Sequence, residues 1–326
     1  MPTHVQSLPL VSIVIPAYNE EKYLAECIES VLAQTHHNWD CTVVNNCSTD
    51  GTLAIAEKYA ARDPRISILT NDRLIPALSN MNLAFRQISA ESKYCKMVLA
   101  DDWIFPECLQ RMVAVMEEYP SVGIVGAYGL VERWIVWAGL PYPSNFVSGR
   151  EICRQRLLGG PYVFGSPTSL LFRSDLVRSH SPFYNESNIH ADSEACFELL
   201  KDCDFGFVHQ VLTFSRDERS GSRLEKSREL NTAAAGMLHE LVVYGPHYLT
   251  SEEYNGRLKA MVANYYEFLA GSFLRPRTSE FWNYHKEKLR DAGIEFKRTR
   301  LAYRVGKRIL DRFRVHRRHD VRQWGL

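Results

Sequence analysis

The chain has 326 residues, of which 45% are hydrophobic and 24% are charged, and its formal net charge is +1. This composition is typical of a globular protein long enough for one large domain, or for one domain with a sizeable appendage. The nearly neutral net charge gives no general electrostatic reason to expect binding to nucleic acid.

Cysteine usage and the N-terminal sequence indicate a cytoplasmic protein. The eight cysteines form no CxxC pair and no compact disulfide framework, and we interpret Cys41, Cys95 and Cys153 as small core residues. The opening MPTHVQSLPLVSIVIPAYNEE lacks a basic region followed by an apolar segment of signal length. No apolar stretch is long enough to cross a bilayer, so any membrane contact is expected to be peripheral, at the inner face.

Short β-branched runs alternate with segments of helical periodicity up to residue 127. Strands are predicted over 10–16, 39–45, 65–70, 93–100 and 121–127. Helices are predicted between them, over 20–34, 48–63, 77–90 and 106–120. This alternation predicts an α/β fold with a mainly parallel central sheet that is flanked by helices.

Polar residues gather where four of these strands end, which is the edge where parallel sheets bind ligands. They are Tyr18, Asn19 and Glu20, Asn45 to Asp50, Asn71 to Arg73, and the pair Asp101-Asp102. Two adjacent carboxylates at the end of an apolar run are unfavourable unless positive charge lies nearby. The pair forms either a solvated turn or a cation site, and the convergence of the strand ends favours the cation site.

The remainder of the chain changes character twice. Between about 126 and 222, additional strands and a short helix are expected first. A helix over 190–202 and a strand over 205–216 complete this region. After residue 222 the pattern is helical only. We therefore expect an α/β domain over 1–222 and a helical C-terminal region with a basic tail over 223–326.

Four segments together resemble the family 2 glycosyltransferases, which are inverting enzymes with the GT-A fold. They are VSIVIPAYNEEKYL, VVNNCSTDGT, VLADDW and NIHADSEACFELL, in the family's order and over roughly the first two thirds of the chain. The resemblance implies a GT-A-like nucleotide-sugar-binding fold and a metal-dependent glycosyltransferase of the hexosyltransferase type. The alternatives are a nucleotidyltransferase and a non-catalytic sugar-nucleotide or glycan-binding module, although PAYNEE is not the Gly- and Arg/Lys-rich phosphate loop that a nucleotidyltransferase needs.

The resemblance assigns the two neighbouring aspartates to a divalent ion. Asp102 is implied as the ligand of Mg²⁺ or Mn²⁺, while Asp101 lies toward the ribose or a water on the ion. Such ions prefer oxygen ligands and use one or two carboxylates together with phosphate oxygens. Adjacent residues of an extended segment point in opposite directions, so the two aspartates share this task only if the chain turns there.

The loop after the first strand is implied as the nucleotide-contacting loop, through Pro16, Ala17, Tyr18 and Glu20. Tyr18 is expected to stack on the base or contact its edge. The alternative is that Tyr18 only packs its loop and that Glu20 belongs to a helix start, where acidic residues are favoured.

Asn45-Asn46 departs from the family pattern, which commonly has aspartates at these positions. The second aspartate accepts a hydrogen from the imide nitrogen of uracil, and the amide oxygen of Asn46 is expected to accept it here without a negative charge. Because an amide also donates, the donor remains open among UDP-, dTDP- and GDP-sugars.

Asp192 matches the family's general base, which removes a proton from an acceptor hydroxyl in a single inverting displacement. Glu194 is the alternative base, and His190 is interpreted as a supporting residue. Arg73 is interpreted as an exposed loop residue, and Arg216 as a candidate contact to the diphosphate. The QxxRW signature of processive synthases is absent, so transfer of one sugar to a saccharide or lipid-linked acceptor is expected.

The C-terminal segment predicts a basic amphipathic helix. Leu301, Val305, Ile309 and Phe313 fall on one helical stripe among arginines. This helix either lies on an anionic membrane surface or docks on its own protein or on a twin subunit in a homodimer.

Overall fold

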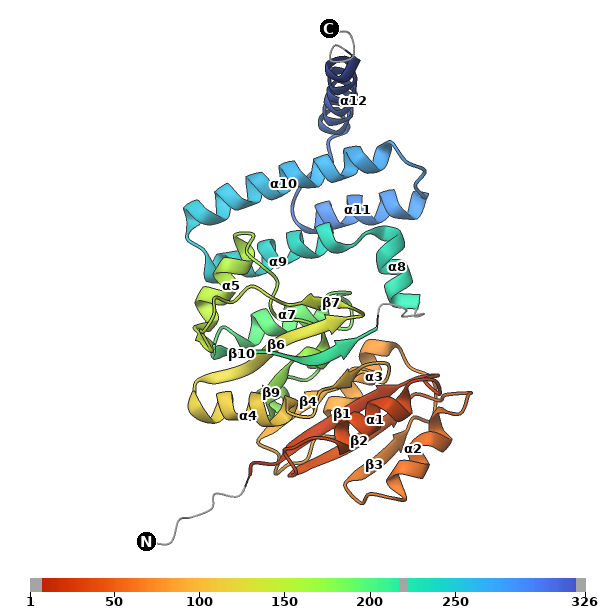
Figure 1. The fold of residues 1–326 in the computed structure, drawn as a ribbon. Helices are drawn as coiled ribbons and strands as arrows, with labels where there is room; N and C mark the ends of the chain where they lie inside the picture. Colours follow the sequence, from red (N-terminus) through yellow and green to blue (C-terminus); the bar gives the residue numbers. More distant parts are fainter. Residues whose placement is uncertain (1–7, 217–221, 321–326) are drawn as a thin grey trace. The chain divides into compact units, whose positions relative to one another are not determined.

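The computed structural model describes residues 8–216 and 222–320, with side chains described except over 222–225 and 312–320. Two compact units divide the chain, Met1–Arg219 and Ser220–Leu326 (Figure 1). Phe313 of the predicted amphipathic stripe lies outside the described side chains.

The first unit is built on a large mixed sheet. Its strands are β1 (Val11–Ala17), β2 (Trp39–Asn45), β3 (Ile66–Thr70), β4 (Tyr94–Met97), β5 (Trp103–Ile104), β6 (Val122–Val131), β7 (Trp134–Val136), β8 (Phe146–Val147), β9 (Leu171–Arg173) and β10 (Asp204–Ser215). They run in the order β3-β2-β1-β4-β9-β6-β10-β5, with β7 on β6 and β8 on β10. The predicted strand–helix alternation is confirmed, and β1 pairs in parallel with both β2 and β4.

Strand β9 separates two parallel blocks of the sheet. It pairs antiparallel with β4 on one side and with β6 on the other, while β6 and β10 are parallel. The carboxyl ends of β1, β2, β4, β6 and β10 therefore lie at one edge of the sheet (Figure 1). This edge is where the sequence predicts the site.

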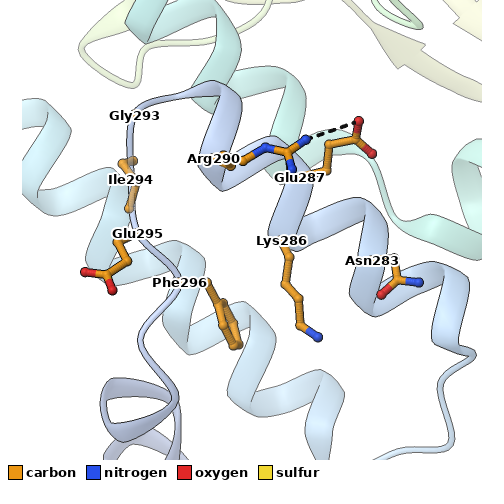
Figure 2. A pocket seen from close by; sticks show the side chains of 8 residues that line it. All are labelled: Asn283, Lys286, Glu287, Arg290, Gly293, Ile294, Glu295 and Phe296. Carbon is orange, nitrogen blue, oxygen red and sulfur yellow. Dashed lines mark ion pairs between the residues drawn. The ribbon is translucent and has the colours of Figure 1, made fainter.

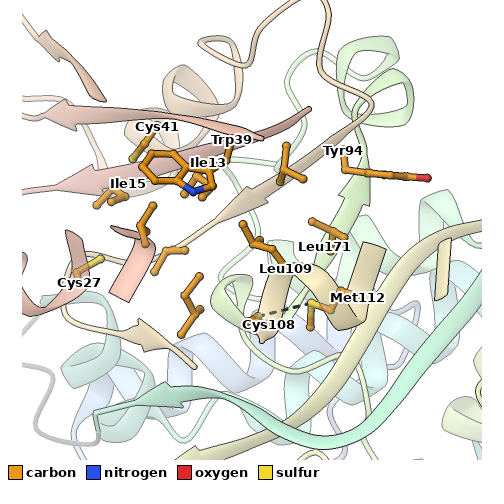
Figure 3. Close-up of a cluster of buried hydrophobic side chains, with 14 of the residues drawn as sticks. Ile13, Ile15, Cys27, Trp39, Cys41, Tyr94, Cys108, Leu109, Met112 and Leu171 are labelled. Carbon is orange, nitrogen blue, oxygen red and sulfur yellow. Dashed lines mark hydrogen bonds between the residues drawn. The ribbon is translucent and has the colours of Figure 1, made fainter. Parts of the chain in front are cut away.

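The helices of this unit bury apolar faces on the sheet. They are α1 (Leu24–Leu32), α2 (Thr52–Ala60), α3 (Ala77–Phe85), α4 (Cys108–Glu118), α5 (Gly149–Leu157), the 3₁₀ turn η1 (Pro167–Ser169), α6 (Ser174–Ser179) and α7 (Ala191–Leu199). One core joins Ile13 and Ile15 of β1 to Leu109 and Met112 of α4, all fully buried (Figure 3). Burial of apolar surface on this scale is the main force holding the sheet edge in place.

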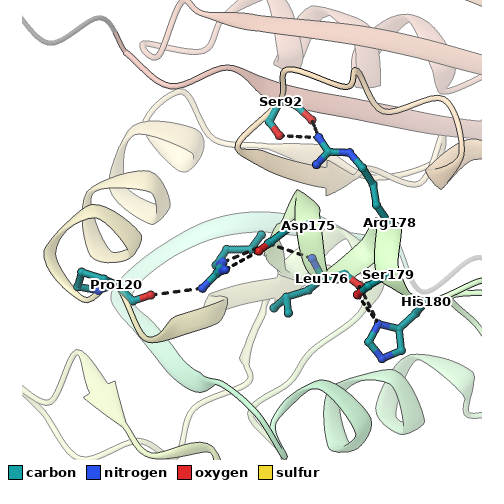
Figure 4. Close-up of polar contacts among 8 residues, drawn as sticks. Ser92, Pro120, Asp175, Leu176, Arg178, Ser179 and His180 are labelled. Carbon is teal, nitrogen blue, oxygen red and sulfur yellow. Dashed lines mark hydrogen bonds and ion pairs between the residues drawn. The ribbon is translucent and has the colours of Figure 1, made fainter.

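Polar contacts fix the corner where β9 enters α6. Arg178 donates from Nη2 to the carbonyls of Ser92 at 2.7 Å and Ser89 at 2.8 Å, so α6 is tied to the segment that precedes β4 (Figure 4). Arg173 pairs with Asp175 in the same corner. These contacts fix the start of β4.

The second unit is helical, with α8 (Ser222–Leu230), α9 (Ala233–Tyr248), α10 (Ser251–Phe273), α11 (Ser279–Asp291) and α12 (Arg298–Asp320). Its core includes Tyr265, Leu269, Phe281 and Leu289, each at most 2% exposed. Helix α10 begins with a capping box between Thr250 and Glu253. Among the described residues, no helix is both long and apolar enough to span a membrane.

The predicted basic helix docks on its own chain along one face. Leu301 is buried, Arg304 forms an ion pair with Glu267 of α10, and the Arg300 guanidinium lies 4.7 Å from the ring centroid of Tyr266. The opposite face carries exposed Tyr303 and Leu310, at 68% and 61% exposure. The helix therefore combines a docked face with an unpartnered one among the described residues.

A buried histidine makes the stability of the second unit pH-dependent. His285 is 1% exposed, and its Nε2 donates to the carbonyl of Leu230 at 2.8 Å, which leaves Nδ1 to accept from the Tyr265 hydroxyl at 2.6 Å. Burial lowers the pKa of His285 from 6.5 to about 4. The unfolded chain binds this proton more readily than the folded chain, so stability is complete above pH 6.5 and is lost as the pH falls toward 4.

We expect His285→Phe to remove this pH dependence, which amounts to roughly 3 kcal/mol of unfolding free energy between pH 6.5 and 4. The substitution also leaves the Tyr265 hydroxyl and the Leu230 carbonyl without this partner, so the variant is less stable at neutral pH. Urea unfolding across the pH range measures both effects. The exposed histidine variant His247→Asn is the control, and an unchanged slope in His285→Phe would contradict the assignment.

Candidate functional site

The loops after β1 and β2 are bonded to each other. Asn19, at φ 55°, donates from its backbone N to Ser48 Oγ at 3.0 Å and accepts from Thr49 N at 2.8 Å. The backbone N of Glu20 donates to Thr52 Oγ1 at 2.7 Å. These bonds fix the predicted nucleotide loop and leave the Tyr18 ring 44% exposed beside it.

Pro16 and Ala17 lie at the end of β1, and their backbone is paired with β2. Pro16 is opposite Val44, and the Ala17 carbonyl accepts from Asn46 N at 2.9 Å. Ala17 is 2% exposed. These two residues therefore belong to the paired backbone at the carboxyl end of β1.

The chain does turn at the two aspartates. Strand β4 ends at Met97, three residues earlier than predicted, and Asp102 N donates to the Leu99 carbonyl at 2.9 Å, which closes a tight turn. Asp101 is half-buried and Asp102 is 1% exposed. We call residues 99–102 the carboxylate turn.

Both carboxylate oxygens of Asp102 accept hydrogen bonds from the protein. Oδ2 accepts from Thr168 Oγ1 at 2.6 Å and from Ser215 Oγ at 3.1 Å, and Oδ1 accepts from the backbone N of Arg216 at 3.4 Å. A buried carboxylate is stable only when donors compensate its charge. Asp102 therefore ties the carboxylate turn to η1 and to the end of β10.

Arg216 closes the other side of the turn. Its Nε donates to the backbone carbonyl of Asp101 at 3.0 Å, and its guanidinium pairs with Glu26 of α1 and lies 4.2 Å from the ring centroid of Tyr23. The side chain of this predicted diphosphate contact thus orients Asp101. Arg73, the other arginine considered, is exposed in the loop after β3.

The carboxylates of this edge act together on a buried thiol. Burial raises the pKa of Cys27 well above its usual value, and Cys41 and then the carboxylates of Asp102, Asp101 and Glu20 raise it further. The three acidic side chains therefore lie close enough to α1 to act on Cys27.

Asn46 is bonded to the loop that follows β3. Its Nδ2 donates to the Ile75 carbonyl at 2.8 Å, while its Oδ1 accepts from Ile75 N at 3.0 Å and from Asn71 Nδ2 at 2.8 Å. The two backbone groups of Ile75 fix the orientation of this amide. The oxygen that was expected to accept from a base already accepts two hydrogen bonds, and one amide hydrogen remains.

Asp192 and Glu194 lie in the first turn of α7 but differ in their contacts. Glu194 accepts from Asn185 Nδ2 at 3.1 Å and from Asn188, and so closes the loop over 185–190. Asp192 is half-buried, and its Oδ1 accepts from the backbone N of Ser193 at 2.9 Å. Of the two, Asp192 is the carboxylate that is not bound to the preceding loop, and His190 is the residue just before the helix.

Hydrogen bonds at both ends of one short stretch of backbone join the carboxylate turn to this helix start. Thr168 bonds Asp102, and earlier in the same segment the Tyr162 hydroxyl donates to the Gly165 carbonyl at 3.0 Å. The Tyr162 oxygen then accepts from Ser193 Oγ at 2.9 Å, next to Asp192. Sequence reasoning missed Thr168, Ser215 and Tyr162, because their importance depends on partners far away in the chain.

The arrangement fits a magnesium or manganese ion only with help from a ligand. In the described part of the chain, no group of three His, Cys, Asp or Glu side chains could hold an ion alone. Asp101 supplies a half-buried carboxylate, and the hydrogen bonds of the buried Asp102 hold the turn that carries it. One or two carboxylates completed by phosphate oxygens and water are the usual coordination of Mg²⁺.

The second unit contains a separate hollow of about 760 Å³ between α11 and the residues that follow it (Figure 2). Lys286 and Arg290 line it together with Glu287 and Glu295, and Arg290 lies 3.8 Å from Glu287. None of the predicted site residues lines this hollow.

Curated relatives match part of the chain. One is an uncharacterized glycosyltransferase of Haemophilus influenzae, 28% identical over 195 residues, which cover 58% of this chain and 59% of the relative. Another is the putative glycosyltransferase EpsE of Bacillus subtilis, 37% identical over 164 residues, which cover 47% of this chain and 57% of the relative. The chain thus spans less than three fifths of the length of these relatives.

Solved structures resemble the fold more extensively. TarS of S. aureus in complex with UDP-GlcNAc superposes with a TM-score of 0.63 at 20% identity, over 86% of this chain and 80% of that one. The mannosyltransferase PcManGT of Pyrobaculum calidifontis, in complex with GDP-Man and Mn²⁺, gives a TM-score of 0.56 at 13% identity, over 94% and 81%.

The family model described as glycosyl transferase family 2 matches residues 12–180, which is more than half of the chain. This region contains the predicted nucleotide loop, the carboxylate turn and the segment with Tyr162 and Thr168. Its sheet, flanked by helices, has the GT-A architecture of the solved structures. The chain belongs to glycosyl transferase family 2.

Proposed function

We propose that this chain transfers one glycosyl group, with inversion, from a nucleoside diphosphate sugar to a hydroxyl group of a saccharide or lipid-linked acceptor. The observation that carries the proposal is that one segment, residues 162–168, bonds Asp102 through Thr168 and Ser193 through Tyr162, and so links the carboxylate turn to the start of α7. Donor and acceptor groups of a transferase must be held at a fixed separation, and this segment supplies one. Two further relatives support a role in polysaccharide biosynthesis by their names, the putative teichuronic acid biosynthesis glycosyltransferase TuaG of Bacillus subtilis and the chondroitin synthase of Pasteurella multocida.

The chemistry of the step assigns a task to Asp192. The acceptor hydroxyl gives its proton to the Asp192 carboxylate while its oxygen bonds to the anomeric carbon, from the face opposite the diphosphate. The bond from that carbon to the diphosphate oxygen breaks, and its electron pair stays on the diphosphate. One displacement inverts the anomeric centre, and nearby negative charge stabilises the oxocarbenium character of the transition state.

On the donor side, Asp101 is the better placed of the two aspartates to hold a cation. Asp102 is buried with both oxygens accepting protein hydrogen bonds, so the order that the resemblance implies for the pair is reversed in this proposal. Mg²⁺ or Mn²⁺, when bound there, neutralises charge that builds up on the departing diphosphate. The Mn²⁺ in the PcManGT complex supports this proposal.

The donor is proposed to be a UDP-, dTDP- or GDP-sugar. The loop proposed to contact the nucleotide contains Pro16, Ala17, Tyr18 and Glu20. Tyr18 offers an exposed ring for stacking on the base. The neighbours bind UDP-GlcNAc and GDP-Man, which supports a nucleotide-sugar donor but leaves the base open.

Two carboxylate variants test the site as a whole. In a thermal-shift screen of UDP, dTDP and GDP with and without Mn²⁺, we expect wild-type stabilisation only when one nucleotide and the metal are both present. Asp101→Asn should abolish that stabilisation while the melting temperature without ligand stays close to wild type. Asp192→Asn should keep the stabilisation but lose on the order of 10²-fold or more in sugar release from the donor.

The control is Glu194→Gln, which alters a neighbouring carboxylate that closes the 185–190 loop and should keep most of the turnover. Release of pyrophosphate from a nucleoside triphosphate would instead support a nucleotidyltransferase. Full turnover in Asp192→Asn would assign the base elsewhere. Stabilisation by nucleotide without sugar release from any donor would support a binding module.

Asn46→Asp tests whether this position reads the base or holds the loop. A carboxylate has no hydrogen for the Ile75 carbonyl, so two oxygens would face each other where a 2.8 Å bond now lies. We expect a loss of roughly 1–3 kcal/mol in stability and weaker nucleotide binding by a similar factor for every base. Asn38→Asp, which breaks a comparable bond to the Leu8 carbonyl, is the control. A selective gain for UDP would show base recognition instead.

The exposed face of α12 supports peripheral contact with an anionic membrane. Tyr303, Lys307 and Leu310 share this face at helical spacing, and each is exposed. We expect the double variant Tyr303→Ser/Leu310→Ser to reduce flotation with phosphatidylglycerol-containing vesicles, because it removes the apolar side chains of the exposed face. The docked face is unchanged in this variant. Vesicles of phosphatidylcholine alone and the α9 variant Val243→Ser are controls. Equal flotation of all proteins would refute membrane contact, and dimerisation through this face would appear as a concentration-dependent mass.

A further inference from the structure

Lys96 is a charged residue in the interior of the sheet. It lies on β4 and is 0% exposed. Its ammonium donates to the Thr168 carbonyl at 2.6 Å and to the Leu170 carbonyl at 3.1 Å. Burial lowers the pKa of Lys96, which Cys108 and the carboxylate of Asp102 oppose. An ammonium in a protein core requires such partners, because its loss of hydration is costly.

The two carbonyls that accept from Lys96 belong to one short segment, Tyr162–Leu170, which we call the bridging segment. Within it, Gly165 has a φ of 76°, and a Cβ added there would lie 2.5 Å from the Ser169 side chain. Ser166 and Ser169 form a reciprocal capping box around η1. The bridging segment is therefore internally bonded.

Each end of the bridging segment contacts one half of the proposed site. At the Thr168 end, the hydroxyl accepts from Leu99 N at 3.1 Å and donates to Asp102, so it holds both sides of the carboxylate turn. At the Tyr162 end, the hydroxyl binds Ser193 beside Asp192. The Tyr162 ring also lies against Trp137 with centroids 5.6 Å apart.

We infer that Lys96 is a positioning residue that sets both halves of the site through the bridging segment. It holds the backbone of Thr168 and Leu170, and thereby fixes the carboxylate turn on one side and the start of α7 on the other. The inference rests on the proposed function only where it assigns the carboxylate turn to the donor and the start of α7 to the acceptor. That Lys96 holds the bridging segment between these two places rests on the contacts alone. Misplacement by about 1 Å in a reacting centre costs up to 10²-fold in rate, so such a residue affects turnover without touching the reactants.

The test uses three variants, one at each end of the bridging segment and one at Lys96. Mn²⁺-dependent binding and hydrolysis by water are measured with UDP-N-acetylglucosamine and GDP-mannose, using whichever the wild type binds. Thr168→Val should weaken binding on the order of tenfold, because Asp102 loses a short charge-assisted bond. Tyr162→Phe should leave binding near wild type and lower turnover at saturating donor about tenfold. Lys96→Met should combine both losses.

A readout without donor or metal checks the mechanical link directly. In ligand-free protein, amide hydrogen exchange should accelerate in Lys96→Met over both 99–102 and 190–194, which are remote from each other in sequence. Ser174→Ala is the matched control, because it removes a buried hydroxyl bond of 3.0 Å to Ser92 at the other end of β4. This control should change neither exchange region.

The outcomes distinguish the inference from the proposed function. If the wild type binds neither nucleotide sugar, the proposed function fails while hydrogen exchange still decides the role of Lys96. If Lys96→Met folds and leaves exchange and binding unchanged, the inference is wrong. Should Lys96→Met not fold, identical profiles for Thr168→Val and Tyr162→Phe would overturn it, and the opposite profiles described above would support it.

Discussion

A nearly buried carboxylate needs donors, and the donors of Asp102 come from distant parts of the chain. Thr168 approaches from η1, and Ser215 and the backbone of Arg216 approach from the end of β10. Each donor must be positioned within hydrogen-bonding distance, because an unsatisfied buried carboxylate destabilises the fold by more than a surface contact stabilises it. The bonding of Asp102 therefore brings β4, η1 and β10 together at one point, and Asp101 takes its position from that point.

Periodicity and strand ends predicted most of the first unit, because those signals are local. The alternation of β-branched and helical segments identified β1 to β4 and the helices between them, and the polar strand ends located the edge of the sheet. Strand β9 was not foreseen as an antiparallel insertion between β4 and β6. Its three residues are too few for a periodic signal, and its place depends on long-range pairing.

Candidate site residues could be named from the sequence when a motif carried them, and could not be named when only geometry did. Asp101, Asp102 and Asp192 stand in recognisable segments, whereas Lys96 and Thr168 occur in stretches that resemble any strand or turn. Motif matching also transfers a role together with a position. At Asn46 the amide replaces a carboxylate and bonds both backbone groups of Ile75, a pattern that a carboxylate cannot form because it lacks a donor.

Lys96 raises the question of why a charged residue occupies the centre of a sheet. An apolar side chain of similar volume would pack against Met112 without the cost of burying an ammonium. It would leave the carbonyls of Thr168 and Leu170 without their donors. Core stability alone is therefore a poor explanation for a lysine here. A requirement for a fixed bridging segment explains it better, because two carbonyl contacts to one ammonium define the position of that backbone more narrowly than apolar packing does.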